Sequence, residues 1–426
     1  MSRLPSLLIT LILLAAQFHL FKKKDKYTQP EVSVYGYLLM SDGLGRQSAE
    51  LINFYLKKGI DVTFFNTRIP CFDDLSAPLL DFFKKKNHRK PGSIIIYEEA
   101  LFKKPELLAQ ELSRSYEDDI KFAYTMFESS KIPKNFVENL NKYFDAAIVP
   151  DPYHIEVYKS SGVAIPIFVL PLGIDIKQFC LSPLKKNKNY PFIFANFSSC
   201  TYRKNQKLLI ESFAKRFKNN PAVLLKIRCR SEDPGFCNEL QKLITSLELK
   251  NIDFSIRCPG KEEYLKEFQE VDCYVSLSKG EGFSIQPREA LALGIPCIVT
   301  CNTAQKTLCE LESVRSVKSD MEEKAIIHTF DEYIGMQYNA LASDVIDAFN
   351  DVYNNYENYI NKGSSSRLWA SNYLYENLEN KYLSLIGRNL VEFGDENTIT
   401  SSEIRTNSKK LYQKLLRIKF TKHQLY

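Results

Sequence analysis

Short apolar runs alternate with longer amphipathic segments along most of this 426-residue chain. The pattern begins at Val32 with an apolar run (VSVYGYLLM), a turn (SDGLGRQ), a helical segment (SAELINFYLKKG) and a second apolar run (DVTFFN). It restarts after residue 191 and continues to about residue 300. Strands that alternate with helices pair in parallel, because each crossover helix returns the chain to the same sheet edge. The sequence therefore predicts an α/β protein with two Rossmann-like parallel-sheet domains.

Two linker-like stretches divide the chain between these domains. One is PLGIDIKQF, which starts at Pro171, and the other is the polar, proline-bearing segment 181–191. Such stretches are typical of domain boundaries. With 44% hydrophobic and 25% charged residues, the chain can form two cored domains. We expect a first domain at 31–172, a second at 173–365, a helix packing back on the body at 366–394 and a tail at 395–426.

The stretch from Glu281 to Thr300, EGFSIQPREALALGIPCIVT, has the layout of a ligand-binding turn between two strands. Residues 279–282 (KGEG) break the apolar run before them, Pro287 suits the first turn of a helix, and Gly294 followed by Pro296 ends that helix before a second apolar run. A helix that starts after such a strand offers main-chain N–H groups and the positive end of its dipole to phosphate. Glu281 and Glu289 bracket this turn. The segment predicts a nucleotide-linked ligand.

Two such domains, with seven residues between Glu281 and Glu289, resemble the retaining nucleotide-sugar glycosyltransferases of the GT-B fold, the glycosyl transferases group 1. Gly43-Leu44-Gly45 is similar to the family's glycine loop, Pro171-Leu172-Gly173-Ile174-Asp175 to its interdomain turn, and Arg203-Lys204-Asn205 to the start of its phosphate-binding helix. The order of these motifs is more specific than any one of them. The resemblance implies two facing domains with a nucleotide-sugar cleft between them.

The resemblance also implies roles for charged residues. A diphosphate leaving group develops negative charge as the sugar bond breaks, and Lys204, assisted by Arg203, would meet that charge. A solvated helix start is the alternative reading of this basic run. Glu289 would hold the donor ribose, and Glu281 would lie beside the donor sugar as the catalytic carboxylate. A carboxylate near a helix N-terminus is also stabilising in itself, so a structural role for Glu289 stays open.

Main-chain groups complete the expected donor site. Phe283 and Ser284 would present N–H groups to the donor, next to Gly282. Gly43 and Gly45 would let the backbone of the opposite wall approach the ligand, and a plain tight turn is the alternative.

Two further positions bear on the site. Glu128, at the end of a predicted strand, is a candidate contact for acceptor or sugar, and a surface carboxylate is the alternative. Position 199 holds serine where the family often has an arginine shortly before its phosphate lysine. Either Arg203 replaces that arginine or one phosphate contact is missing. The sequence shows no dedicated metal motif, so we expect no metal and no cofactor besides the donor substrate.

The cysteines indicate the compartment. Ten cysteines lie mostly in apolar contexts, with no CxxC pair and no companion histidine cluster. This disfavours zinc and redox motifs, and buried free thiols fit a reducing compartment. We expect the catalytic part to be cytosolic.

Both ends of the chain point to a membrane surface. Residues 1–30 include an uncharged run from Leu4 to Phe21 followed by lysines, which fits an anchor, a signal-peptide core or a start codon placed too early. Residues 401–426 hold seven basic side chains and one glutamate, which equals the excess of six basic residues in the whole chain. They form either a basic amphipathic helix at a membrane or a solvated terminal helix. We expect membrane association rather than nucleic-acid binding.

These inferences converge on a glycosyltransferase that moves a sugar from a nucleoside diphosphate sugar to a glycan or lipid-linked acceptor. Retention of configuration follows from the resemblance alone. Two alternatives stay open: another enzyme on the same fold, such as a nucleotide-sugar epimerase or a phosphorylase, and a non-catalytic nucleotide-sugar binding module. Release of nucleoside diphosphate only on addition of acceptor separates transfer from epimerisation.

Overall fold

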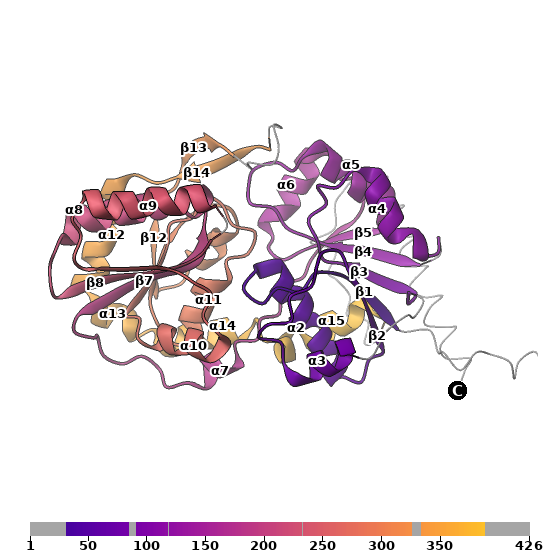
Figure 1. Ribbon diagram of the computed structural model, residues 1–426, viewed down its shortest axis with the longest axis horizontal. Coiled ribbons are helices and arrows are strands. Elements are labelled where there is room, and N and C mark those ends of the chain that lie inside the picture. Colours follow the sequence, from indigo (N-terminus) through magenta and orange to yellow (C-terminus); the bar gives the residue numbers. More distant parts are fainter. Residues whose placement is uncertain (1–30, 85–90, 118, 232, 326–333, 388–426) are drawn as a thin grey trace, which may run out of the picture.

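The computed structural model describes residues 31–84, 91–117, 119–231, 233–325 and 334–387. In Figure 1 two helix-covered sheets lie side by side, one formed by the first part of the chain and one by the second. The N-terminal apolar run and the basic tail fall outside the described residues. Within the described ranges, no helix is both long and apolar enough to cross a bilayer.

The first sheet has six parallel strands in the order β2-β1-β3-β4-β5-β6. Every residue of β1, β3 and β5 is buried, because helices cover both faces of such a sheet. Its strands are β1 (Val32–Gly36), β2 (Val62–Asn66), β3 (Ile94–Tyr97), β4 (Ile120–Tyr124), β5 (Ala146–Val149) and β6 (Ile167–Val169). Its helices are α2 (Gly43–Lys57), α3 (Ala77–Lys84), α4 (Pro105–Glu111), η1 (Leu112–Arg114), α5 (Lys134–Tyr143) and α6 (Tyr153–Ser161).

The second sheet repeats this architecture, with six parallel strands in the order β12-β11-β10-β7-β8-β9. The predicted α/β class with two parallel sheets is therefore confirmed. The strands are β7 (Phe192–Cys200), β8 (Val223–Ser231), β9 (Ile252–Ile256), β10 (Cys273–Ser276), β11 (Cys297–Thr300) and β12 (Val314–Val317). The helices are α7 (Lys177–Leu181), η2 (Tyr202–Lys204), α8 (Gln206–Phe217), α9 (Pro234–Ser246), α10 (Lys261–Gln269), α11 (Ile285–Ala292), η3 (Thr303–Leu308), α12 (Ala342–Asn354), α13 (Tyr356–Ile360) and α14 (Gly363–Ser371).

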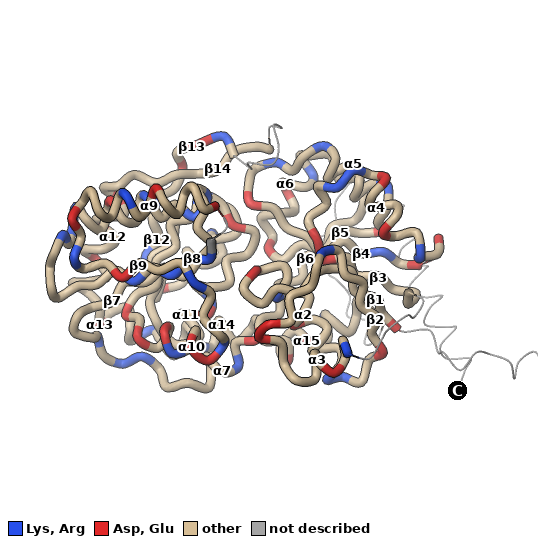
Figure 2. The backbone as a smooth tube through the Cα atoms, viewed as in Figure 1, with Lys and Arg blue, Asp and Glu red and all other residues tan. Residues whose placement is uncertain are grey.

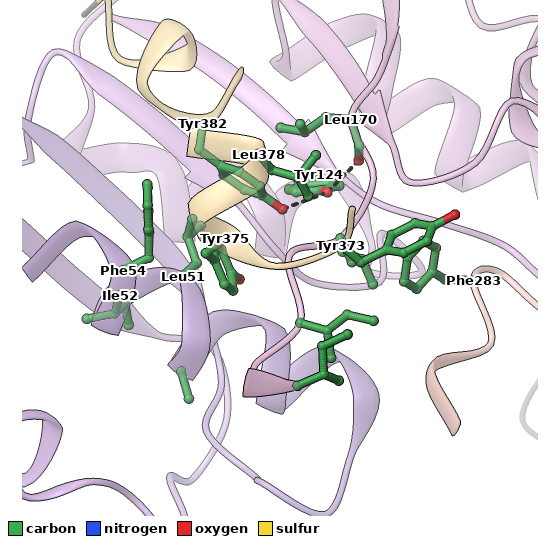
Figure 3. Packing of buried hydrophobic residues seen from close by; sticks show 14 of the residues in the cluster. Leu51, Ile52, Phe54, Tyr124, Leu170, Phe283, Tyr373, Tyr375, Leu378 and Tyr382 are labelled. Carbon is green, nitrogen blue, oxygen red and sulfur yellow. Dashed lines mark hydrogen bonds between the residues drawn. The ribbon is translucent and has the colours of Figure 1, made fainter. Parts of the chain in front are cut away.

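The last described helix, α15 (Tyr375–Leu385), returns to the first half and packs against α2 (Figures 1 and 3). The rings of Tyr375 and Phe54 stack with centroids 5.2 Å apart. The Tyr382 hydroxyl accepts a hydrogen bond from the Gly173 main-chain N–H (2.8 Å) and donates one to the Pro171 carbonyl (3.1 Å). The chain segment between the two halves is thus fixed by the helix that closes the fold.

A short antiparallel hairpin forms a further connection between the halves. Its strands, β13 (Met321–Lys324) and β14 (Met336–Asn339), belong to the second half. The Ser130 main-chain N–H donates to the Met336 carbonyl (3.0 Å), and the Met336 N–H donates to the Ser130 hydroxyl (2.8 Å). Ala325 and Ile334 are buried in the apolar cluster of the first half. The alternating pattern in the sequence did not predict this hairpin.

Tyr382→Phe is expected to destabilise the protein by about 1–3 kcal/mol, because the buried Gly173 N–H loses its acceptor. Urea unfolding of the full chain measures the change. Tyr202→Phe is the matched control, since its hydroxyl bonds to Glu239 in an exposed position. Equal stabilities of the two variants would contradict the role given to the Tyr382 hydroxyl.

Glu98, fully buried at the end of β3, makes stability depend on pH. Burial raises its pKa from 4.5 to about 7, although Gln47 donates a hydrogen bond to it (2.9 Å). Since the pKa is raised in the folded state, the contribution of the Glu98 carboxyl to the stability of the fold is fully present below pH 4.5. It is lost as pH rises through about 7. We expect the stability of Glu98→Gln relative to the wild type to increase by on the order of 3 kcal/mol as the pH rises from 5 to 8. Urea unfolding at both pH values tests this, and a pH-independent difference would refute it.

Candidate functional site

A cavity of about 450 Å³ lies between the two halves. Its lining comes from loops and helix starts that follow β1, β4, β7, β8, β9 and β10. The carboxyl ends of the strands of both sheets therefore meet at this cavity, which is where parallel sheets bind ligands. In Figure 2 basic and acidic residues both occur along the two halves. The cavity likewise contains both signs of charge.

Lys204, Arg203 and Glu281 meet in the wall formed by the second half. The Lys204 ammonium lies 2.5 Å from one carboxylate oxygen of Glu281, and the Arg203 guanidinium lies 3.2 Å from the other. Arg203 also donates to the Gly280 carbonyl (2.7 Å). Burial alone would raise the pKa of Glu281, but the two cations lower it to about 2. Glu281 is therefore a carboxylate at any physiological pH.

Glu128 comes from the opposite half and completes this cluster. It follows β4, lines the cavity, and places a carboxylate oxygen 3.7 Å from the Arg203 guanidinium. The structure thus brings the candidate acceptor contact next to the candidate phosphate-binding residues.

Glu289 lies at a second junction of the two halves. Its side chain is fully buried, and it accepts hydrogen bonds from Arg46 of the first half (2.7 Å) and from the Tyr264 hydroxyl (2.7 Å). We expected Glu289 in the first turn of its helix. Because α11 begins at Ile285, Glu289 is in the second turn, so contact with the helix N-terminus does not account for its position.

The start of α11 has a strained backbone. Ser284 precedes the helix with φ +69°, in the left-handed region that a residue with a side chain rarely adopts, and its side chain makes no capping hydrogen bond. The first N–H groups of a helix have no acceptor within that helix. Both Phe283 and Ser284 line the cavity. This geometry suits an anionic ligand at the helix start.

Arg288 holds this turn in place, and the motif did not identify it. It is fully buried and donates hydrogen bonds to the carbonyls of Phe283 and Ser284, the latter at 2.9 Å. The rings of Phe283 and Tyr373 lie 3.9 and 4.6 Å from the guanidinium carbon. Figure 3 shows these two rings against each other. An arginine among the apolar residues of a short helix was the available signal in the sequence.

Gly282 and Gly280 flank Glu281 where the halves touch. A Cβ atom on Gly282 would lie 2.7 Å from the Met126 side chain, and one on Gly280 would lie 2.1 Å from the Glu128 carbonyl oxygen. We expected glycine at position 282 because the neighbouring N–H groups of Phe283 and Ser284 would face a donor. Its close contact with the other half is a sufficient reason for glycine at this position.

The glycine motif of the first half is helical rather than a loop. Helix α2 begins at Gly43, and Asp42 caps it by accepting hydrogen bonds from the N–H groups of Leu44 and Gly45 (3.1 and 3.3 Å). A Cβ atom on Gly45 would lie 2.6 Å from the Leu39 nitrogen, whereas one on Gly43 would meet open space. Gly43 lines the cavity, and Gly45 is required by packing against the preceding turn. The expected loop is corrected to a capped helix N-terminus.

Arg288→Lys is expected to lower the free energy of unfolding by about 2 kcal/mol or more, because lysine lacks the planar guanidinium that stacks on the rings of Phe283 and Tyr373. Chemical denaturation of the full chain measures this. The control is Arg216→Lys, a half-buried arginine stacked on Phe217 at 4.6 Å, outside the cavity. A smaller loss for Arg288→Lys than for the control would contradict the anchoring role.

Two facing parallel sheets with a ligand-sized cleft at their carboxyl ends define the GT-B class of fold. Residues 182–334 match the model of the family described as glycosyl transferases group 1. The uncharacterized protein 356 of Sulfolobus islandicus rod-shaped virus 1 is 22% identical over 328 residues, which cover 72% of this chain and 88% of that protein.

Solved structures agree with this fold. HepE of Anabaena, crystallised with UDP-glucose, superposes with a TM-score of 0.57 at 14% identity, over 83% of this chain and 98% of that one. Sucrose-phosphate synthase of Thermosynechococcus elongatus gives 0.59 at 14% identity, over 83% and 98% of the two chains. A glycosyltransferase of Rickettsia africae gives 0.58 at 16%, over 86% and 100%. The predicted GT-B fold is confirmed.

Proposed function

We propose that this protein is a glycosyltransferase that moves a sugar from a nucleoside diphosphate sugar to an acceptor. The observation that carries the proposal is the cluster of Lys204, Arg203 and Glu281 beside the strained start of α11, in a cavity between two facing sheets. The match of residues 182–334 to the glycosyl transferases group 1 supports it. The similarity to HepE with UDP-glucose supports the same donor class.

The reaction requires stabilisation of charge on the leaving diphosphate. Lys204 and Arg203 supply two cations, and the start of α11 supplies main-chain N–H groups near Phe283 and Ser284. These two cations would serve in the place where other transferases use a metal ion. Glu281 holds both cations in position before the donor binds. A phosphate that enters the cavity would share them with this carboxylate.

The donor ribose would lie at Glu289. Arg46 and Tyr264 fix both carboxylate oxygens, and each oxygen has a further lone pair for a sugar hydroxyl. Arg46 belongs to the first half, so a ribose at this position would be held where the two halves meet.

The finer features of the reaction belong to the same proposal. Glu281, ionised in the wall of the cavity, would lie beside the donor sugar and stabilise positive charge on it. We infer retention of configuration from the resemblance to the retaining glycosyltransferases alone, and Glu128 is the proposed contact for acceptor or sugar. A glycan or lipid-linked acceptor at the cytosolic face of a membrane is proposed from the basic tail and the N-terminal apolar run.

Isothermal calorimetry of the full chain with UDP, GDP, ADP and CDP tests the donor site. We expect one diphosphate to bind, and Lys204→Ala to weaken its affinity about tenfold or more through loss of a charge-assisted contact. Glu289→Gln should lower the affinity for the same diphosphate several-fold. Lys207→Ala is the control, because Lys207 is half exposed, pairs with Glu239 and lies outside the cavity lining.

Absence of binding by all four diphosphates would sink the proposal. Binding without turnover would instead indicate a nucleotide-sugar binding module. Conversion of the bound sugar without any acceptor would indicate an epimerase.

A further inference from the structure

Arg230 extends into the cavity from strand β8, next to the position where Ser199 stands on β7. The two residues are direct partners in the parallel register of these strands. Side chains at paired positions of neighbouring strands point to the same face of a sheet, and the strands lie about 4.8 Å apart. The Arg230 guanidinium donates a hydrogen bond to the Ser199 hydroxyl (2.9 Å), and both residues line the cavity. The guanidinium of Arg230 therefore fills the space beside Ser199.

The same guanidinium reaches across the cleft. It lies 2.9 Å from a carboxylate oxygen of Asp42 and donates to the Ser41 carbonyl at 3.0 Å. Burial alone would raise the pKa of Asp42, but Arg230 and a hydrogen bond from Tyr37 lower it. The Asp42 carboxylate of the first half is thus paired with the Arg230 guanidinium in the wall of the cavity.

Its neighbour Arg228 shows a different arrangement. Arg228 pairs with two carboxylates of its own half, Asp253 at 2.6 Å and Glu267 at 2.8 Å. These pairs tie Arg228 into the second half itself. Arg230, in contrast, has a carboxylate partner on the opposite wall, Asp42, and a movement of the halves or an entering anion can exchange that partner.

We propose that Arg230 binds the diphosphate of the donor, in the space that a long side chain at position 199 would otherwise occupy, and exchanges the carboxylate of Asp42 for a phosphate oxygen. This inference rests on the proposed function, because it assigns a residue to the same donor. It resolves the two readings of Ser199 that the sequence leaves open. On this proposal Arg203 is not the replacement for an arginine at position 199, and the phosphate contact is not missing. Arg230 on the neighbouring strand supplies that contact.

The exchange has a physical consequence for donor binding. A guanidinium holds phosphate through two parallel N–H groups, a geometry that lysine lacks. Since Asp42 caps α2 and competes for the same guanidinium, removal of its charge would favour the phosphate. A purely structural link between the halves predicts the opposite, because loss of either partner would break it.

The test uses calorimetry on the full chain with the nucleoside diphosphate that the wild type binds and with the corresponding nucleoside. Arg230→Ala should lower the affinity for the diphosphate about tenfold or more and leave the affinity for the nucleoside unchanged. Asp42→Asn, which retains the helix cap, should bind the diphosphate as tightly as the wild type or more tightly. Ser199→Arg in the Arg230→Ala background should regain most of the lost affinity, and Lys207→Ala should match the wild type.

Three results would overturn the proposal. Unchanged diphosphate affinity in Arg230→Ala removes Arg230 from the site and leaves the proposed function intact. Equal losses in Arg230→Ala and Asp42→Asn assign the pair to domain contact instead. No diphosphate binding by the wild type overturns the proposed function as well. If Arg230→Ala melts at a lower temperature than the wild type, two further variants decide between phosphate binding and domain contact. These are Arg230→Lys and the Arg230→Ala/Ser199→Arg double variant, whose diphosphate affinities and melting temperatures are both measured.

Discussion

Charge buried between the two sheets must find a partner of opposite sign, and the cleft is built around this constraint. Lys204 and Glu281 satisfy it within the second half. Arg46 with Glu289 satisfies it across the cleft. In these pairs the carboxylate and the cation both line the cavity, so each cation is held in the cavity wall by a carboxylate of the protein. The Arg46–Glu289 contact that joins the halves is thus itself part of the cavity wall.

The spacing between the halves is fixed by close backbone contact. Gly280 and Gly282 allow the turn before α11 to touch the residues that follow β4. The hairpin β13–β14 adds main-chain hydrogen bonds to Ser130 near the same place. Glu128, two residues before Ser130, therefore faces Arg203 at 3.7 Å. Packing between the halves thus places Glu128, the proposed acceptor contact, beside Arg203, a proposed donor contact.

The fold could be predicted because its signal is local. Strands such as β3 and β10 are buried along their whole length, so they appear in sequence as unbroken apolar runs between helices. The segment containing Glu281 and Glu289 is also short enough to be recognised as one unit. In contrast, β13 has the sequence MEEK and is largely exposed, which gives no strand-like apolar pattern.

The partners across the cleft could not be predicted, since they depend on how two domains pack. Arg46 lies 243 residues from Glu289 along the chain, and no periodicity relates such positions. Arg230 follows from the pairing of β8 with β7, which a single sequence does not specify. The helical start at Gly43 and the left-handed Ser284 were likewise missed, because a capping side chain and tertiary packing override the usual preference of these residues.

A crystal structure of the full chain with its nucleoside diphosphate tests the central claim most directly. The account predicts phosphate oxygens within hydrogen-bond distance of Lys204 and Arg230, the ribose at Glu289, and Asp42 displaced from the Arg230 guanidinium. A diphosphate bound away from these side chains, or a ribose that does not contact Glu289, would contradict the assignment of the cavity as the donor site.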